Sequence, residues 1–337
     1  MELNENTTIW ELYDEPNLYA MRGNYISSVN DQWMQTALHC SLREIHEQHP
    51  TWGLKDMLYG LYRLEQAAYA ADPVVFSVYP EKEIAETPEK AQVQLVYFSA
   101  LEKQKSSYAL LLSGGAYGAV CTLSEAMPVA ARLNEFGYSC FCLNYRTASK
   151  ESFIHGLLPK PLEDIATALR LIRNKAKSLG INPDRYLMGG FSAGGHLAAL
   201  WGTAHLGARA YELPQPELLM LGYPLVNSLH FPKNPLSDYL KKGMYGTEYT
   251  TENEMSYAVN LHIDEDYPPV YLAAARDDDT IPENDTTCFA SALEKGRVTH
   301  HFEIAAHGGH GFGLGSETEL FGWVDRAMKW MEMHYGA

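Results

Sequence analysis

Short apolar runs alternate with amphipathic stretches along most of the chain after residue 73. Runs such as Tyr108–Leu112, apolar at every position, are typical of strands buried on both faces of a sheet. Alternation with predicted helices on this scale indicates a mostly parallel sheet with helices on both faces, which is an α/β fold. The expected strands are Val74–Tyr79, Gln92–Phe98, Tyr108–Leu112, Tyr138–Leu143, Tyr186–Met188, Leu218–Gly222, Val270–Ala275 and His300–Ile304, and the expected helices are Pro128–Phe136, Pro161–Leu179, Asn284–Glu294 and Thr318–His334, with another that starts at His196.

Residues 1–72 have a different pattern. They are rich in Trp, Tyr, His and Met and poor in runs of β-branched residues. Two amphipathic helices are predicted there, Asp31–Glu47 and Leu54–Ala70, with Pro50 and Gly53 at the join. A helical extension of this kind either caps a pocket or packs on the flank of the main domain, and the sequence leaves both readings open.

We therefore expect two parts, a helical N-terminal extension over residues 1–72 and an α/β domain over residues 73–337. A length of 337 residues suits one large α/β domain with an appendage. Residues 230–266 break the alternation with prolines, charges and aromatic residues, so we expect an insertion before the seventh strand or so. Insertions at the carboxyl ends of strands in α/β folds often shape a pocket.

Composition narrows the choice of partners and compartment. The net charge of −16 repels nucleic-acid phosphates, so we expect no nucleic-acid partner. The five cysteines include no C-x-x-C pair, and we interpret them as reduced thiols of a cytoplasmic protein. The first residues are acidic and show no apolar signal segment, and no apolar run approaches membrane-spanning length.

Residues 190–194 read Gly-Phe-Ser-Ala-Gly and match the pattern G-x-S-x-G between a predicted strand and a predicted helix. This pattern places a serine on a tight strand-to-helix turn with its hydroxyl exposed. Glycines on either side avoid collisions with the neighbouring backbone, and N–H groups at the start of the helix can stabilise an anion. The context favours Ser192 as a nucleophile over a plain glycine-rich connection.

A serine nucleophile needs a base, and the base needs an acid that orients it. In this architecture the acid precedes the histidine along the chain. Three consecutive aspartates follow the strand Val270–Ala275, and they cannot all point inward. We prefer Asp278 as the acid, with Asp277 and Asp279 as alternatives.

The base is expected in the glycine-rich stretch after the last strand. We favour His310, which is flanked by glycines and lies further along the loop, over His307. His300 and His301 bring the number of nearby histidines to four. They lack the spacing of a helical metal motif, so we expect no metal site. His196, at a helix start, is interpreted as a packed or capping residue.

The anion that forms when Ser192 attacks a carbonyl needs hydrogen-bond donors. One expected donor is the N–H of Ala193, directly after the nucleophile. The others are the N–H groups of Gly114, Gly115 and Ala116, in the loop after the third expected strand. A phosphate-binding loop is the alternative reading, but no G-K-[ST] follows.

These segments together resemble the α/β-hydrolase superfamily, and within it the hormone-sensitive-lipase-like and acetyl-xylan or feruloyl-type esterase branch. The resemblance covers the chain from Pro73 onward and implies a triad of Ser192, Asp278 and His310. Residues 1–72 match no motif of the branch, and Ser113 and Ala116 replace its usual His or Pro and Gly. The matching segments are S-G-G-A-Y at 113–117, L-N-Y-R at 143–146, G-F-S-A-G-G-H-L at 190–197, D-D-T-I-P at 278–282 and H-G-F-G at 310–313.

The resemblance implies a serine carboxylic-ester hydrolase that acts on small acyl or acetyl esters, including acetylated carbohydrates. His310 would deprotonate Ser192, an acyl-enzyme would form, and water activated by His310 would release the acyl group. This chemistry needs no cofactor and no metal, and its partner is a small-molecule ester. The sequence leaves open whether the chain forms a homo-oligomer.

Two other functions are compatible with the same residues. A peptidase or amidase, including a formamidase-like enzyme, would use the same triad on another bond, but no internal repeat indicates the propeller domain of such peptidases. A catalytically silent ligand-binding relative would keep the fold, although such proteins usually lose a member of the triad.

Overall fold

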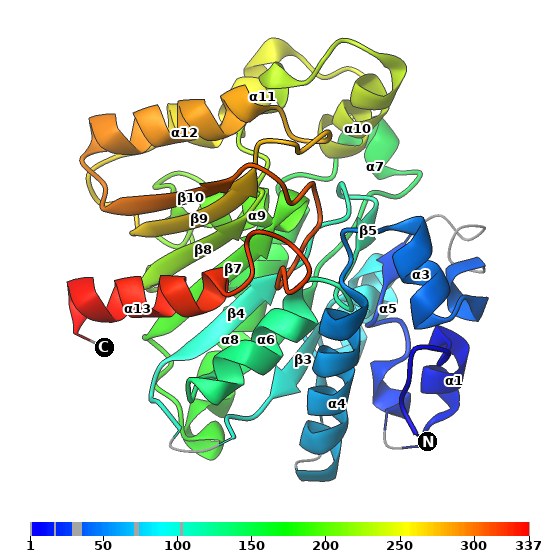
Figure 1. The fold of residues 1–337 in the computed structure, drawn as a ribbon. Coiled ribbons are helices and arrows are strands. Elements are labelled where there is room, and N and C mark those ends of the chain that lie inside the picture. The colour runs from blue at the N-terminus through cyan, green and yellow to red at the C-terminus, as the bar shows by residue number, and fades with distance from the viewer. Residues whose placement is uncertain (1, 17, 29–35, 71–73, 102–103, 337) are drawn as a thin grey trace.

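A large sheet runs through the middle of the molecule (Figure 1). The computed structural model describes residues 2–16, 18–28, 36–70, 74–101 and 104–336, and within them this sheet has eight strands. Neighbouring strands are parallel except for two antiparallel pairs at one edge, as the strand–helix alternation predicts. In spatial order the strands are β10 (His300–Ala305), β9 (Val270–Ala275), β8 (Leu218–Gly222), β7 (Tyr186–Phe191), β4 (Tyr108–Leu112), β6 (Ser139–Asn144), β3 (Gln94–Phe98) and β2 (Val75–Ser77).

The strands lie where the apolar runs place them. The bounds of β4, β8 and β9 are those predicted, because each is apolar throughout and buried on both faces. β7 is longer than predicted, since Gly189 and Gly190 continue the strand instead of starting the turn. A Cβ on Gly189 would lie 2.4 Å from a terminal methyl of Leu111, so a larger residue here would displace that side chain between β7 and β4.

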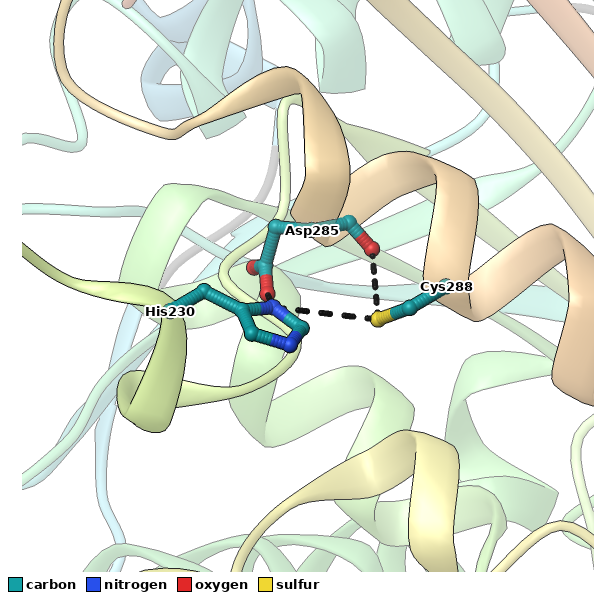
Figure 2. Close-up of side chains that lie close together, drawn as sticks. All are labelled: His230, Asp285 and Cys288. Atoms are coloured by element: carbon teal, nitrogen blue, oxygen red, sulfur yellow. Dashed lines mark hydrogen bonds and ion pairs between the residues drawn. The ribbon is translucent and has the colours of Figure 1, made fainter.

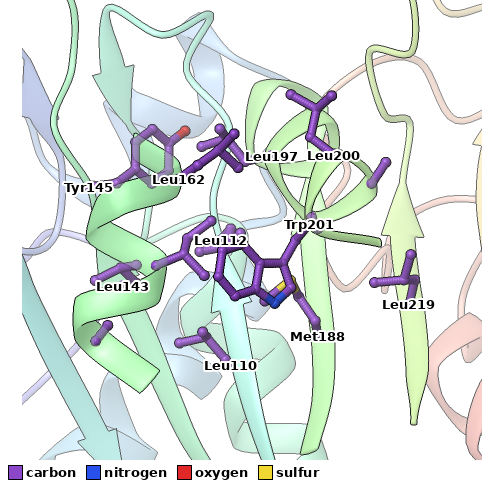
Figure 3. Packing of buried hydrophobic residues seen from close by; sticks show 14 of the residues in the cluster. Leu110, Leu112, Leu143, Tyr145, Leu162, Met188, Leu197, Leu200, Trp201 and Leu219 are labelled. Atoms are coloured by element: carbon purple, nitrogen blue, oxygen red, sulfur yellow. The ribbon is translucent and has the colours of Figure 1, made fainter. Parts of the chain in front are cut away.

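Two buried apolar clusters, one on each face, hold the helices to the sheet. One cluster joins the sheet to α8 and α9, and Figure 3 shows part of it, with Leu162 of α8 and Trp201 of α9 beside the strand residues. The other joins the opposite face to α4, α6 and α13. The helices of the main domain are α5 (Glu81–Glu86), α6 (Ala126–Glu135), α7 (Ser152–His155), α8 (Lys160–Leu179), α9 (Ser192–Gly202), α12 (Glu283–Gly296) and α13 (Trp323–Tyr335).

The N-terminal residues form α1 (Ile9–Asp14), α3 (Leu42–Gln48) and α4 (Leu54–Ala70). The bounds of α4 are those predicted, but the predicted helix Asp31–Glu47 is wrong as a continuous element. Ser41 is extended and caps α3 through a reciprocal bond pair with Glu44, and residues 31–35 lie outside the described part of the chain. The buried residues of these helices pack in the same apolar cluster as α6, against the same face of the sheet. The division at residue 72 stays a prediction.

The segment 230–266 lies between β8 and β9, the seventh strand of the large sheet along the chain, and its status as an insertion stays a prediction. It contains two helices that the sequence reading missed, α10 (Pro235–Tyr245) and α11 (Thr251–Ser256), each capped by the side chain of the preceding residue. A small antiparallel pair, β1 (Ser27–Ser28) with β5 (Ala119–Val120), was also missed. Among the described helices, none has the length and apolar character needed to cross a membrane.

Candidate active site

The turn between β7 and α9 carries Ser192 at the first position of the helix. Its φ of 51° lies in the left-handed region that non-glycine residues rarely adopt, and the residue is 8% exposed. A Cβ on Gly190 would lie 2.4 Å from the carbonyl oxygen of Gly194, and one on Gly194 would lie 2.2 Å from that of Leu112. Both positions therefore require glycine, Gly190 because the turn folds closely on itself and Gly194 because it packs against the end of β4.

The imidazole of His310 lies between Ser192 and Asp278. Its Nε2 is 2.9 Å from Ser192 Oγ, and its Nδ1 is 2.8 Å from Asp278 Oδ2. The other carboxylate oxygen accepts the N–H groups of Thr280 at 2.9 Å and Ile281 at 2.8 Å, which fixes the acid directly after β9. Because an ionised carboxylate only accepts hydrogen bonds, Nδ1 donates to it and Nε2 is left to accept the serine proton.

The alternative acid and base residues lie elsewhere. The carboxylate of Asp277 accepts the N–H groups of Gly308 at 2.9 Å and Gly309 at 2.8 Å, and these bonds lower its pKa below the usual value. Asp279 is exposed, and its carboxylate accepts the hydroxyl of the next residue. His307 is largely exposed, with Nδ1 3.4 Å from Asp277. Asp277 therefore fixes the loop that carries His310, residues 306–313, which we call the His310 loop.

The loop after β4, residues 113–118, contacts the turn that carries Ser192, and we call it the oxyanion loop. A Cβ on Gly114 would lie 2.7 Å from Ser192 Cβ, so the two segments are in close contact. The N–H of Gly114 donates to the carboxylate of Glu125 and is already occupied. Gly115 has a φ of 132° and Ala116 a φ of 53°, so the chain turns sharply here. Gly115, Ala116 and Ala193 are left as the candidate donors to an oxyanion.

His196 is packed as predicted. It is fully buried, with Nδ1 2.6 Å from the hydroxyl of Tyr117 in the oxyanion loop and Nε2 2.8 Å from the carbonyl of Tyr257. Burial lowers its pKa to about 4, so the ring is neutral at physiological pH. Its contact with Tyr117 fixes the far end of the oxyanion loop.

Three residues around Ser192 and His310 were not singled out from the sequence. Glu125, at the start of α6, and Tyr223, directly after β8, are both buried beside the site. Thr51, in the link between α3 and α4, donates its hydroxyl to the carbonyl of His310 at 2.5 Å. The one available signal was a lone acid, Glu125, in an otherwise uncharged stretch.

Figure 2 shows the one group of described side chains that could hold a metal ion, His230, Asp285 and Cys288. None of them was a predicted site residue. The Asp285 carboxylate accepts two backbone N–H groups, those of Val226 and Asn227, and lies 2.7 Å from His230 Nδ1. Burial raises the pKa of Cys288 to about 12, so its thiol stays protonated and donates to the Asp285 carbonyl at 3.1 Å. Hydrogen bonding between the loop after β8 and α12 therefore accounts for this group.

The chain is similar to proteins that are named as esterases. A family model described as BD-FAE matches residues 96–293. An acetylxylan esterase from Xylanibacter ruminicola is 29% identical over 235 residues, which are 67% of this chain and 45% of that protein. The chain spans less than half the length of the curated relatives it matches.

Solved structures of similar proteins are matched over a larger share of their own length. The acetyl ester-xyloside bifunctional hydrolase from Caldicellulosiruptor lactoaceticus has a TM-score of 0.65 and 29% identity, and the match covers 78% of this chain and 98% of that one. MGS-M1, an α/β hydrolase enzyme from a deep-sea metagenome library of the Medee basin, has a TM-score of 0.55 and 25% identity, with 72% and 92% covered. Together with the sheet topology, these matches confirm the predicted α/β-hydrolase fold.

Proposed function

Because this chain belongs to the BD-FAE family, we propose that it is a serine carboxylic-ester hydrolase acting on small acyl or acetyl esters. The observation that carries the proposal is the position of His310, within hydrogen-bond distance of both Ser192 Oγ and Asp278 Oδ2. This arrangement can activate a hydroxyl that is otherwise a weak nucleophile.

In the proposed reaction, His310 Nε2 takes the proton of Ser192 as Oγ attacks the ester carbonyl. Asp278 keeps the imidazole in the required tautomer and stabilises its charged form. The N–H groups of Ala193 and of Gly115 or Ala116 would stabilise the oxyanion. The imidazolium then protonates the leaving alcohol, and a water deprotonated by His310 releases the acid from the acyl-enzyme.

Acetylated carbohydrates are the substrate class that we favour. The support is the similarity to one protein named an acetylxylan esterase and to another named an acetyl ester-xyloside hydrolase. We also propose a reducing compartment such as the cytoplasm, since all five cysteines are unpaired thiols.

The test is a panel of short acyl esters and acetylated oligosaccharides, assayed on wild type, Ser192→Ala and His310→Ala. We expect Ser192→Ala to lose at least about 10³-fold in kcat while remaining folded. Ser291→Ala is the matched control, because that hydroxyl is bonded within the exposed face of α12. Equal activity of Ser192→Ala and wild type would contradict the proposal.

Two further measurements separate the alternatives. Faster turnover of aminoacyl anilides than of acyl esters would favour a peptidase or amidase. A fluorophosphonate probe that fails to label Ser192 in the wild-type protein would favour a silent ligand-binding relative.

A further inference from the structure

Glu125 is a buried acid that the proposed reaction does not use. It is 3% exposed and precedes the first residue of α6. Its side chain makes no capping bond to that helix, so helix capping does not explain it. Burial raises its pKa to about 7, a sign that the site holds this carboxyl against an appreciable desolvation cost.

One carboxylate oxygen of Glu125 holds the oxyanion loop. Oε2 accepts the N–H of Gly114, and the carbonyl on the other side of the same peptide, that of Ser113, accepts the hydroxyl of Tyr145 at 2.7 Å. The Ser113 hydroxyl in turn accepts the N–H of Ala126 at 3.2 Å. The peptide before Gly114 is therefore held at both ends, which fixes the direction in which the next two N–H groups emerge.

The other oxygen reaches the His310 loop through Tyr223. The Tyr223 hydroxyl donates to Glu125 Oε1 at 3.0 Å and accepts the N–H of Gly313 at 3.0 Å. When Glu125 is ionised, its oxygens only accept, so the Tyr223 hydroxyl donates its one proton to Oε1 and accepts from Gly313. The Tyr223 ring also meets the His310 ring edge-on, with 4.8 Å between centroids.

The His310 loop and the start of α6 are in direct contact at this point. A Cβ on Gly313 would lie 2.2 Å from the carbonyl oxygen of Ser124, the residue before Glu125. The chain segments after β4, β8 and β10 thus converge on one carboxyl group, and a Cβ on Gly114 would meet both Ser192 Cβ at 2.7 Å and Glu125 Oε1 at 3.2 Å.

We propose that Glu125 is a positioning residue that holds the oxyanion loop and the His310 loop in register on either side of Ser192. The inference rests on the proposed function, since it concerns donors and a base that act on an ester. Glu125 touches neither substrate nor reacting atoms, and it acts through Gly114 on one side and through Tyr223 on the other.

The test compares Glu125→Ala, Glu125→Gln, Tyr223→Phe and the double variant Glu125→Ala/Tyr223→Phe. We expect Glu125→Ala to lower kcat about 10- to 100-fold with KM within about 2-fold, because loss of a true oxyanion donor costs about 10²- to 10³-fold. Glu125→Gln should recover most of this loss, since its amide oxygen can still accept the Gly114 N–H. The double variant should be no worse than Glu125→Ala by more than about 2-fold, because the two residues form one connection.

Glu217→Gln is the matched control. This glutamate precedes β8 at the opposite edge of the sheet and binds a hydroxyl and a cation, Ser107 Oγ at 2.9 Å and Arg185 Nε at 2.7 Å. Its replacement should leave kcat unchanged. Thermal unfolding of every variant identifies those that are folded at the assay temperature. If Glu125→Ala is not folded, the kcat of Tyr223→Phe decides the question.

The outcomes separate this inference from the proposed function. Folded Glu125→Ala and Tyr223→Phe variants with wild-type kcat would overturn the positioning role while leaving the esterase proposal intact. Losses that multiply in the double variant would overturn the shared connection. A wild-type protein that neither hydrolyses esters nor reacts with fluorophosphonate at Ser192 would remove both proposals.

Discussion

Replacing Glu125 by Gln should make the protein more stable at alkaline pH, while kcat stays close to, and slightly below, that of the wild type. The carboxyl is buried, and burial raises its pKa from 4.5 to about 7 despite the hydrogen bonds from Gly114 and Tyr223. Glutamine has nearly the same shape and never ionises. The substitution therefore removes the cost of burying a charged carboxylate and keeps an acceptor for the Gly114 N–H.

The direction of the pH effect follows from the direction of the pKa shift. In the unfolded chain the carboxyl loses its proton near pH 4.5, whereas in the folded protein it keeps the proton until about pH 7. Between these values the folded state binds more protons, so the stability of the wild type falls as pH rises. A rise in pKa from 4.5 to about 7 corresponds to about 3 kcal/mol.

Urea unfolding of wild type and Glu125→Gln at pH 5, 6, 7 and 8 provides the measurement. The difference in unfolding free energy should move in favour of the variant by about 2 to 3 kcal/mol over this range, with most of the change below pH 7. Any constant effect of the altered bond to Tyr223 cancels in this comparison. Other buried acids such as Asp285, whose pKa burial raises to about 6, are present in both proteins and also cancel.

Glu217→Gln again provides the control, because this glutamate is only partly buried and lies away from Ser192. Parallel stability curves for wild type and Glu125→Gln would refute the reasoning, because they would mean that the folded protein does not keep this carboxyl protonated between pH 5 and pH 7. A variant that is stabilised at pH 8 and also impaired in kcat would show a position kept for function at the expense of stability.

Two further predictions concern contacts outside the proposed triad. Thr51→Val removes the hydroxyl bonded to the carbonyl of His310 and should lower kcat/KM about 3- to 10-fold without unfolding the protein. The control is Thr167→Val, which removes a hydroxyl bonded to a carbonyl within α8 and should leave kcat/KM unchanged. Equal kcat/KM values for the two variants would argue against a role for the Thr51 contact. Arg146→Met leaves the fully buried Asp164 without its cation and should lower the free energy of unfolding, measured by urea unfolding, by about 3 to 5 kcal/mol. The double variant Arg146→Met/Asp164→Leu should recover most of this loss. An Arg146→Met variant as stable as the wild type would contradict this account.

The sequence was most informative where one physical cause decides the structure. Strands β4, β8 and β9 are apolar at every position, because parallel strands are covered on both faces. The meeting of Ser192, Asp278 and His310 was predictable for a related reason. Each follows a strand of the parallel sheet, and the carboxyl ends of parallel strands lie at one edge.

Boundaries set by single backbone conformations were less predictable. The periodic pattern of residues 318–334 continues upstream of α13, yet the helix begins only at Trp323 because Gly322 adopts a φ of 80°. In the same way Ser41, which fits a helix by its neighbours, is extended and starts α3 instead. Such positions depend on local capping bonds, which apolar periodicity does not encode.

Glu125 and Tyr223 could not be assigned from the sequence because each acts through residues far along the chain. Glu125 meets Gly114 eleven positions away and Tyr223 ninety-eight positions away. An acid at the start of a predicted helix has an ordinary explanation as a favourable charge there. Only the fold shows that its carboxyl turns away from the helix N–H groups and toward two other loops.

The glycines of the His310 loop explain why these outside contacts matter. Gly309, Gly311 and Gly313 all have positive φ values, so the loop needs glycine for its shape but gains little rigidity from its own sequence. The conformation of the loop must therefore be fixed by neighbouring residues, and the structure shows hydrogen bonds from such residues along its length. Asp277 accepts two of its N–H groups, Tyr223 accepts that of Gly313, and Thr51 donates to the carbonyl of His310 itself. Glu319 likewise accepts the N–H groups of Ala306 and His307. The position of the His310 imidazole therefore depends on contacts from outside the loop, and one of them comes from the N-terminal segment that composition alone would set apart from the α/β domain.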